Sequence, residues 1–294
     1  MSATIIDGKK ISAEIRQEAK VEVDVLKSQG IEPCLAVVLV GDNPASKAYV
    51  GSKVKACEEV GIVSIKEEYG KDISQDDLLA VIDRLNTVEN VHGILVQLPL
   101  PHHIDEDTVI ERIDPAKDVD GFHPVNIGKL AIGLDCLAPC TPAGIPELIT
   151  RSGLTTQHKH VVIIGRSNIV GKPLMNILVQ KGEKANCTVT CCHSGTEHLE
   201  KFTREADILI AAIGVPEFVT AGIVKEGAIV IDVGINRVED IEHSRGYRLV
   251  GDVAYDEVAE IAGAITPVPG GVGPMTVAML MKNTVKAARM IRSK

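Results

Sequence analysis

The chain has 294 residues, of which 45% are hydrophobic and 24% charged, and its formal net charge at neutral pH is −9. This apolar fraction is ample for a packed core and excludes general disorder, while the acidic balance argues against non-specific nucleic-acid binding. No apolar run approaches membrane-spanning length, so we expect no membrane contact.

Strand-like apolar runs alternate with helical patterns in the first half of the chain. We expect a helix over 8–28, a strand over 34–40, a helix that carries Tyr49 and Lys53, a strand over 63–69, a helix over 75–85 and a strand over 93–98. Continuous apolar runs separated by helices are typical of a parallel sheet covered on both faces. A polar, proline-rich segment over 114–146 then interrupts the alternation.

A second alternating set follows, with strands expected over 160–165, 187–192, 206–214 and 227–234, and a last helix over 275–292. We therefore predict an α/β fold with two α/β domains, the second a Rossmann-like doubly wound parallel sheet. The first domain is expected to cover 1–145, with the C-terminal helix 275–294 packing back on it, and the second to cover 146–270.

The seven cysteines show no metal-binding spacing such as C-x-x-C, and their number is odd. Cys191, Cys192 and His193 are consecutive, but neighbours on a strand point to opposite faces and do not converge easily on one ion. Reduced thiols are typical of a cytosolic protein, and the N-terminus has no apolar signal core. We predict a cytoplasmic protein without a metal site.

The segment VVIIGRSNIVGKPL has the strand, turn and helix order of a dinucleotide-binding loop. Gly165 and Gly171 leave the spacing G-x-x-x-x-x-G, which is a weak fingerprint by itself, and an ordinary strand-to-helix connection is the alternative. Pro173 suits a first helical turn, and free amides at that helix end would favour a pyrophosphate.

The choice of cofactor can be argued from the next strand. That strand ends in His193 and Ser194, without the carboxylate that usually holds the ribose hydroxyls of NAD. Arg166 in the first turn can reach a ribose phosphate as a bidentate donor. This pattern predicts NADP. The carboxyl ends of the two later strands, at 213–216 and 232–236, would lie at the same ligand-binding edge of the sheet.

Tyr49 and Lys53 lie four positions apart and share one face of the expected helix. Short-chain dehydrogenases also use Tyr-x-x-x-Lys, but there the pair follows the nucleotide loop in the same domain, whereas here it precedes Gly165 by more than a hundred residues. Two solvated side chains on a helix are the other alternative.

Three further segments have the character of site loops. Gln97 lies at the carboxyl end of a strand, Asp118 and Asp120 lie in a turn ending at Gly121, and the stiff loop 266–276 leads into the last helix. Taken singly, Gln97 is explained by a bond to the backbone and Asp120 by a turn-forming role.

Taken together, the segments GDNPAS, KAYVGSK, VQLPLP, KDVDGFHP, PCTPAG, GRSNIVGKPL, DVGIN and TPVPGGVGPMT resemble, in this order, the tetrahydrofolate dehydrogenase/cyclohydrolase family. The resemblance covers essentially the whole chain. It implies NADP-dependent oxidation of methylenetetrahydrofolate and hydrolysis of the methenyl product to 10-formyltetrahydrofolate, in the one-carbon metabolism that supports purine biosynthesis. It also implies a folate cleft between the two domains and a homodimer formed through the nucleotide domain.

The resemblance assigns roles to particular residues. It implies that four residues are catalytic: Lys53, Tyr49, Gln97 and Asp120. It implies that the same four residues also bind folate, together with Leu98, Pro269, Gly270 and Gly273. It implies cofactor contacts from Gly165, Arg166, Ser167, Ser194 and Ile235. The segment KANCTV departs mildly from the family pattern, without an expected change in function.

The chemistry agrees with these residue types. Substrate nitrogens stabilise the cationic methenyl group, so hydride transfer requires neither a Ser-His-Asp relay nor a metal. Hydrolysis requires an acid or base, and Lys53 is the candidate, with Tyr49 and Gln97 to orient it. The alternatives are an NADP-dependent dehydrogenase for another small substrate, such as a shikimate-type reductase, and a catalytically silent NADP-binding regulator.

Overall fold

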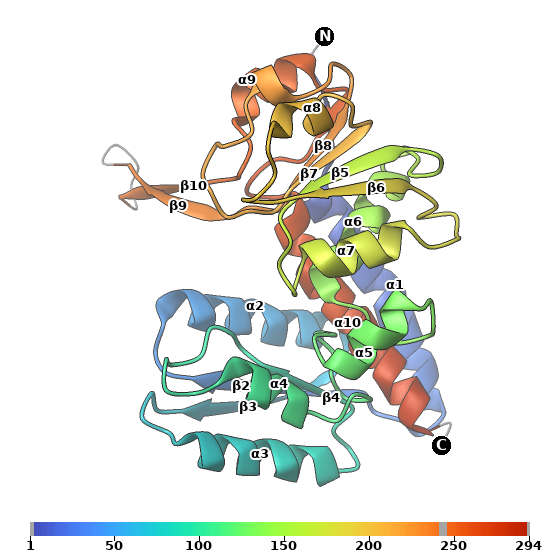
Figure 1. The fold of residues 1–294 in the computed structure, drawn as a ribbon. Helices are drawn as coiled ribbons and strands as arrows, with labels where there is room; N and C mark the ends of the chain where they lie inside the picture. Colours follow the sequence, from blue (N-terminus) through green and yellow to red (C-terminus); the bar gives the residue numbers. More distant parts are fainter. Residues whose placement is uncertain (1–2, 241–245, 293–294) are drawn as a thin grey trace. The chain divides into compact units, whose positions relative to one another are not determined.

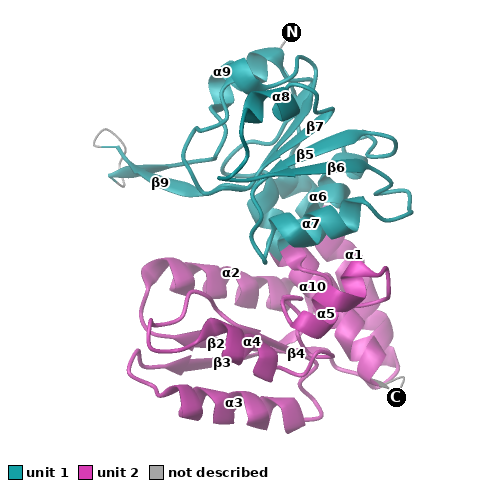
Figure 2. Ribbon diagram, viewed as in Figure 1, with its two compact units in different colours: residues 1–12, 141–276 teal, residues 13–140, 277–294 magenta. Residues whose placement is uncertain are grey.

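The computed structural model describes residues 3–240 and 246–292, and the two ends of the first predicted domain, at positions 1 and 294, lie outside this range. The chain divides into two compact units (Figure 2). Unit 1 comprises residues 1–12 and 141–276, and unit 2 comprises residues 13–140 and 277–294.

Unit 2 is built on a three-stranded parallel sheet of order β3-β2-β4, with β2 at Cys34–Val40, β3 at Val63–Tyr69 and β4 at Gly93–Val96. Every residue of the central strand β2 is buried, as expected for an apolar run covered on both faces. Its helices are α2 (Pro44–Val60), α3 (Gln75–Thr87), α4 (Glu106–Arg112) and α5 (Pro124–Ala131).

The two faces of this sheet are covered by different helices. Ala36 and Val38 pack with Leu78 and Ile82 of α3 and with Val109 of α4 in one apolar core. The intervening residues of β2 point to the opposite face because side chains alternate along a strand, and α2 lies on that side (Figure 1). The helix that carries Tyr49 and Lys53 is therefore held by the sheet core.

Unit 1 contains a six-stranded sheet of order β1-β11-β8-β7-β5-β6, in which all neighbours are parallel. Its strands are β1 (Thr4–Ile5), β5 (His160–Ile164), β6 (Thr188–Cys192), β7 (Ile208–Ala211), β8 (Ile229–Asp232) and β11 (Ala264–Ile265). The predicted parallel strands of the second half are confirmed. The addition of β1 from the N-terminus was not indicated by the hydrophobic pattern.

Helices cover both faces of the six-stranded sheet. Val162 and Ile164 of β5 pack in one apolar core with α8 (Leu199–Thr203), α9 (Tyr255–Ile261) and the short 3-10 helix η1 (Ala221–Ile223). The helix α7 (Gly171–Leu178) lies on the other face in Figure 1. The order is doubly wound at β5, whose neighbours are β6 on one side and β7 on the other. Ligands bind outside the carboxyl ends of strands at such a point.

A separate two-stranded antiparallel sheet, β9 (Asn236–Glu239) with β10 (Tyr247–Val250), extends from unit 1 (Figure 1). The Arg237 guanidinium lies 3.8 Å from the centroid of the Tyr247 ring, a cation–π contact across the two strands.

Three helices, α1 (Gly8–Ser28), α6 (Cys140–Arg151) and α10 (Val272–Arg292), contribute residues to both units. The proline-rich segment over 114–146, which interrupts the predicted alternation, contains α5 and the start of α6, because helices can begin with proline or cap at a polar residue.

Candidate functional site

The local sequence fixes where the helix carrying Tyr49 and Lys53 begins. Asn43 is its N-cap, and its side-chain oxygen accepts from the amides of Ala45 and Ser46 at 2.9 and 3.3 Å. Pro44 occupies the first helical turn, where its missing N–H costs nothing. The start of α2 is therefore encoded directly before the two candidate catalytic residues.

Lys53 and Gln97 are brought together from α2 and from the end of β4. The Lys53 Nζ donates to Gln97 Oε1 at 3.0 Å, although the two residues are 44 positions apart. Gln97 Nε2 in turn donates to the backbone oxygen of Leu98 at 2.6 Å, so the amide orientation is set by the chain itself. Lys53 is only 7% exposed, whereas Tyr49, one turn earlier, is 47% exposed. Burial excludes the surface-lysine interpretation of Lys53.

The carboxyl group of Asp120 completes this cluster electrostatically. Burial raises its pKa above the ordinary value, the positive charge of Lys53 opposes that rise, and the neighbouring Asp118 adds to it. The acidic side chain of Asp120 and the basic side chain of Lys53 therefore lie within electrostatic range of each other in unit 2.

Asp118 shapes the turn that presents Asp120. It is 2% exposed, and its two oxygens accept from the amides of Gly121, Phe122 and His123 and from the Asn126 side chain. Burial raises the pKa of Asp118, and these four donors oppose the rise. Of the two aspartates in this turn, Asp118 is therefore the one that holds the backbone of the turn.

Asn283 of α10 ties the same turn to the end of the chain. Its Nδ2 donates to the backbone oxygens of Val119 and Ala138, each at 2.8 Å. Asn283 belongs to no local motif, so the sequence did not identify it as part of the site. A polar residue on an otherwise apolar face of the last helix was the one signal that could have indicated it.

In unit 1, a cavity of about 430 Å³ lies at the carboxyl ends of β5, β6 and β7. Four predicted cofactor residues line it: Gly165, Arg166, Ser167 and Ser194. Gly165 has a φ of 125°, and an added Cβ would lie 2.2 Å from the backbone oxygen of Ala212. Only glycine fits there, which allows the close backbone approach that a pyrophosphate requires.

The start of α7 differs from the expectation of free amides. Ser167 Oγ accepts from the amides of Val170 and Gly171 at 3.1 and 3.4 Å, and the Ser167 backbone oxygen accepts from Lys172. A serine hydroxyl just before a helix can satisfy such amides. Ser167 therefore shapes the loop as well as lining the cavity.

The remaining predicted residues also lie in unit 1. Pro269 and Gly270 precede α10, and Gly273 lies in its first turn. An added Cβ on Gly273 would lie 3.3 Å from Cδ1 of Ile235, so these two predicted residues are neighbours. Ile235 is 43% exposed and is not among the residues that line the cavity.

The cavity has an apolar wall that sequence reasoning did not assign in full. It is formed by Ala212, Ile213, Val215 and Phe218, which follow β7. In the sequence, the wall was indicated only by the glycine-containing strand end at 213–216. The exposed Phe218 beyond that strand end belongs to no motif. His193 and Leu199 complete the lining on the β6 side.

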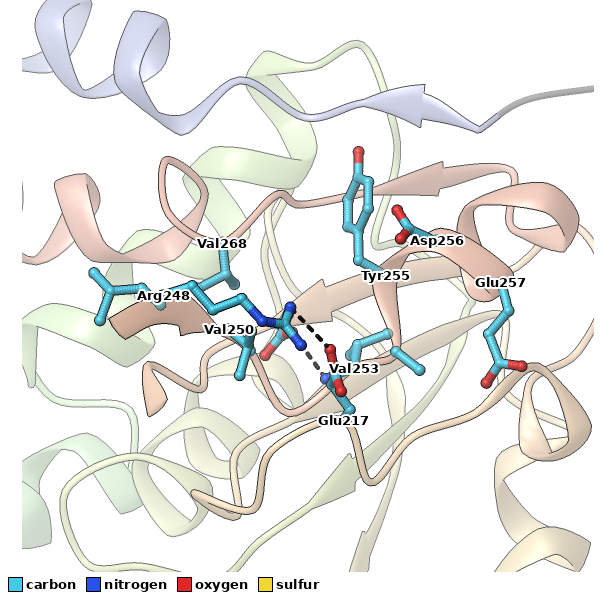
Figure 3. A pocket seen from close by; sticks show the side chains of 12 residues that line it. Glu217, Arg248, Val250, Val253, Tyr255, Asp256, Glu257 and Val268 are labelled. Atoms are coloured by element: carbon cyan, nitrogen blue, oxygen red, sulfur yellow. Dashed lines mark hydrogen bonds and ion pairs between the residues drawn. The ribbon is translucent and has the colours of Figure 1, made fainter. Parts of the chain in front are cut away.

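A second pocket of about 400 Å³ lies between β10 and α9 (Figure 3). The Arg248 side chain points toward Glu217, with 3.5 Å between Nη1 and Oε1, and Asp256 and Glu257 lie on the α9 side. Asp232 also lines this pocket. The sequence pointed here through Asp232, at the strand end 232–236.

The described residues contain no group of three or more metal-ligating side chains, and all seven cysteines, which lie within the described range, are unpaired. In the same residues, no helix is long and apolar enough to cross a membrane.

Comparison with known proteins decides the family. Residues 6–120 match the tetrahydrofolate dehydrogenase/cyclohydrolase catalytic domain, and residues 139–292 match the NAD(P)-binding domain of the same family. The chain belongs to the tetrahydrofolate dehydrogenase/cyclohydrolase family.

Relatives match along the whole length of this family member. The bifunctional protein FolD of Chlorobium chlorochromatii is 55% identical over 290 residues, which are 98% of each chain. The FolD dehydrogenase/cyclohydrolase structure from Campylobacter jejuni is 51% identical, with a TM-score of 0.92 and coverage of 98% of this chain and 99% of that one. The Trypanosoma brucei enzyme, complexed with NADP and an inhibitor, is 39% identical, with a TM-score of 0.92 and coverage of 99% and 98%.

Membership of the tetrahydrofolate dehydrogenase/cyclohydrolase family confirms the resemblance, the two-domain α/β fold class and the bifunctional enzyme. The protein is a methylenetetrahydrofolate dehydrogenase and methenyltetrahydrofolate cyclohydrolase of folate one-carbon metabolism, with a nicotinamide cofactor bound by its NAD(P)-binding domain.

Proposed function

We propose that Lys53 handles the proton in the hydrolysis of methenyltetrahydrofolate. The hydrogen bond of 3.0 Å between Lys53 Nζ and Gln97 Oε1 carries this proposal, because it holds a buried ammonium group in one orientation. Gln97 is the orienting partner, since its own amide is held by Leu98. A fixed, partly dehydrated proton donor or acceptor is what general acid–base catalysis requires.

Asp120 and Tyr49 have separate roles in this proposal. The raised pKa of Asp120 and its proximity to Lys53 suit a carboxyl group that binds the polar end of the folate. Tyr49 exposes its ring on the same helix face one turn before Lys53, where it can stack on a planar substrate. Leu98 adds an apolar contact at the strand end, and we assign Pro269, Gly270 and Gly273 in unit 1 to the folate-binding set.

NADP is the cofactor, and when bound it accepts the hydride in the dehydrogenase reaction. We assign its site to the cavity lined by Gly165, Arg166, Ser167 and Ser194, with Ile235 nearby beside Gly273. The residues fit: glycine admits the backbone, Arg166 supplies a cation for a ribose phosphate, and β6 ends in His193 and Ser194 without a carboxylate.

The proposed role of Lys53 is tested by measuring the two reactions separately. Wild-type protein is expected to reduce NADP with methylenetetrahydrofolate and to hydrolyse methenyltetrahydrofolate. Lys53→Gln removes the titratable group while keeping a polar side chain, and hydrolysis is expected to fall about a hundredfold or more. NADP binding is expected to survive because its cavity is formed by unit 1.

Lys55→Gln is the matched control, because Lys55 lies on the same helix but is exposed. It should keep both activities. Unchanged hydrolysis in Lys53→Gln would show that Lys53 does not handle the proton, and wild-type protein without either activity would refute the function itself.

We also propose that the protein is a homodimer formed through unit 1. The two-stranded sheet β9–β10 supports this, since a separate two-stranded sheet leaves backbone groups on both edges for pairing. Light scattering in solution tests the stoichiometry, and a monomer at micromolar concentration would contradict it. A cytoplasmic location, suggested by the unpaired cysteines, stays a prediction.

A further inference from the structure

Two buried aspartates beside the cofactor cavity have no part in the function proposed above. Asp232 ends β8 and is 3% exposed, and Asp252 follows β10 and is 0% exposed. A buried carboxylate is tolerated only where donors satisfy its oxygens. The donors therefore show what each of these side chains holds in place.

Asp252 holds the end of β7. Its Oδ2 accepts from the amides of Ile213 and Gly214 at 2.7 and 3.0 Å, and its Oδ1 accepts from Asn236 Nδ2 at 2.9 Å. Ile213 lines the cofactor cavity. Two successive amides at a strand end form a natural anion-binding concavity, and here the protein fills it with its own carboxylate.

Asp232 in turn holds Asp252. Its Oδ1 and Oδ2 accept from the backbone amides of Asp252 and Val253, each at 2.9 Å. The arrangement is reciprocal, because each aspartate packs against a glycine within two residues of the other aspartate. A Cβ on Gly251 would lie 1.7 Å from Asp232 Oδ2, and one on Gly234 would lie 2.1 Å from Asp252 Oδ1.

The segment 212–218, which Asp252 anchors, carries the apolar wall of the cavity. Val215 and Phe218 line the cavity but are 46% and 45% exposed, so side-chain packing alone does not immobilise them. The far end of the segment is fixed by the backbone, where the amides of Glu217 and Val219 donate to the oxygens of Gly251 and Asp252 at 3.0 and 2.9 Å. Asp252 provides the side-chain anchor at the near end.

We propose that Asp252 is a positioning residue for NADP, which holds the wall formed by residues 212–218 in the conformation that binds the cofactor. This inference rests on the proposed assignment of the cavity to NADP. Asp252 makes no contact with the reacting atoms in this proposal, and Asp232 serves to orient it.

The test is Asp252→Asn, which keeps the size of the side chain but replaces one acceptor oxygen by a donor. Either the amides of Ile213 and Gly214 or the Asn236 amide then lose their acceptor. We expect the Kd and KM for NADP to rise about tenfold, since hydrogen bonds to a charged group are lost. Hydrolysis of methenyltetrahydrofolate, assayed without cofactor, should stay within about twofold.

Asp207→Asn is the matched control. Asp207 also accepts from a backbone amide, that of His160 at 3.0 Å, and pairs with Lys225 at 2.6 Å, but it lies at the amino end of β7. Its replacement should lower the thermal unfolding temperature without changing the Kd for NADP. An equal Kd in Asp252→Asn and the wild type would overturn the proposal.

Hydrogen exchange provides a second readout. In Asp252→Asn, exchange should rise in the peptide covering 212–219 and should return toward the wild-type rate when saturating NADP is added. If Asp252→Asn does not fold, Asn236→Ala removes one donor to Asp252 and decides instead: a raised Kd supports the proposal and an unchanged Kd overturns it. Wild-type protein that does not bind NADP, or an Arg166→Ala variant that binds it normally, would instead refute the cofactor assignment.

Discussion

Tyr49 and Lys53 differ in burial although they share a helix and a face. Tyr49 is 47% exposed, while Lys53 is 7% exposed and bonded to Gln97. Hiding a lysine from water is costly unless its charge is satisfied, so this burial requires the hydrogen bond to Gln97 and the nearby carboxylate of Asp120. At the scale of the residue, the environment distinguishes a buried, hydrogen-bonded lysine from a solvated one.

Asp232 gives a prediction for the pH dependence of stability. Burial raises its pKa to about 7, opposed by the amides of Asp252, Val253 and Gly234. The folded state then binds a proton that the unfolded state releases near its ordinary pKa of about 4. The free energy of unfolding should therefore fall as the pH rises from about 4 to about 7, by up to about 1.4 kcal/mol per pH unit, and level off above that.

Urea unfolding of Asp232→Asn over this pH range checks the prediction. The variant should be less stable overall, since an amide N–H faces backbone donors, but its stability should decline less with pH. Asp207→Asn is the contrasting case. Bonding to Lys225 lowers the pKa of Asp207, so its contribution is present above pH 4 and lost only as the pH falls further. Equal slopes for Asp232→Asn and wild type would contradict the assignment.

At the scale of the element, α2 carries Lys53, the proposed catalytic lysine, on a helix whose start depends on Asn43. Because the Asn43 side chain satisfies two amides, Asn43→Ala should lower the free energy of unfolding by about 1 kcal/mol. Fraying of the first turn should also move Tyr49 and Lys53, and we expect a severalfold loss in the rate of methenyl hydrolysis.

Ser74→Ala is the comparison for this helix. Ser74 caps α3 by accepting from the amide of Asp77 at 3.1 Å, and α3 carries none of the proposed site residues. Its replacement should have a similar effect on stability and none on hydrolysis. A rate that falls equally in both variants would show that general destabilisation, rather than the position of α2, is responsible.

At the scale of the whole molecule, the two units carry different chemistry. The lysine cluster lies in unit 2 and the cofactor cavity in unit 1. Arg166→Ala should therefore reduce the preference for NADP over NAD by about tenfold or more, because a charged bond to the ribose phosphate is lost, and should leave cyclohydrolase activity unchanged.

Lys53→Gln should give the opposite pattern, with hydrolysis lost and cofactor preference kept. Kinetics with both cofactors and both reactions measure this directly. If Arg166→Ala leaves the cofactor preference unaltered, the assignment of the ribose phosphate to Arg166 is wrong.

Local sequence was sufficient for much of this protein. Helix periodicity, apolar strand runs and caps depend on neighbours within a few positions, so the pattern predicted α1 over 8–28 and β3 over 63–69 at their observed bounds. The nucleotide loop is a contiguous strand, turn and helix, and its motif could be recognised without a structure. The longer motifs, read in order, also identified the family.

Only the tertiary structure decided which distant residues meet. Sheet pairing places β1 beside β11, about 260 positions later, and brings Gln97 to Lys53. The reciprocal packing of Asp232 and Asp252 likewise depends on two glycines that leave room for carboxylates from another segment. Such contacts follow from how strands and helices pack over long separations, and short-range periodicity carries no record of them. That packing distinguishes the lysine proposed to handle a proton from its neighbours, and the aspartate proposed to hold the cofactor wall from one that only forms a turn.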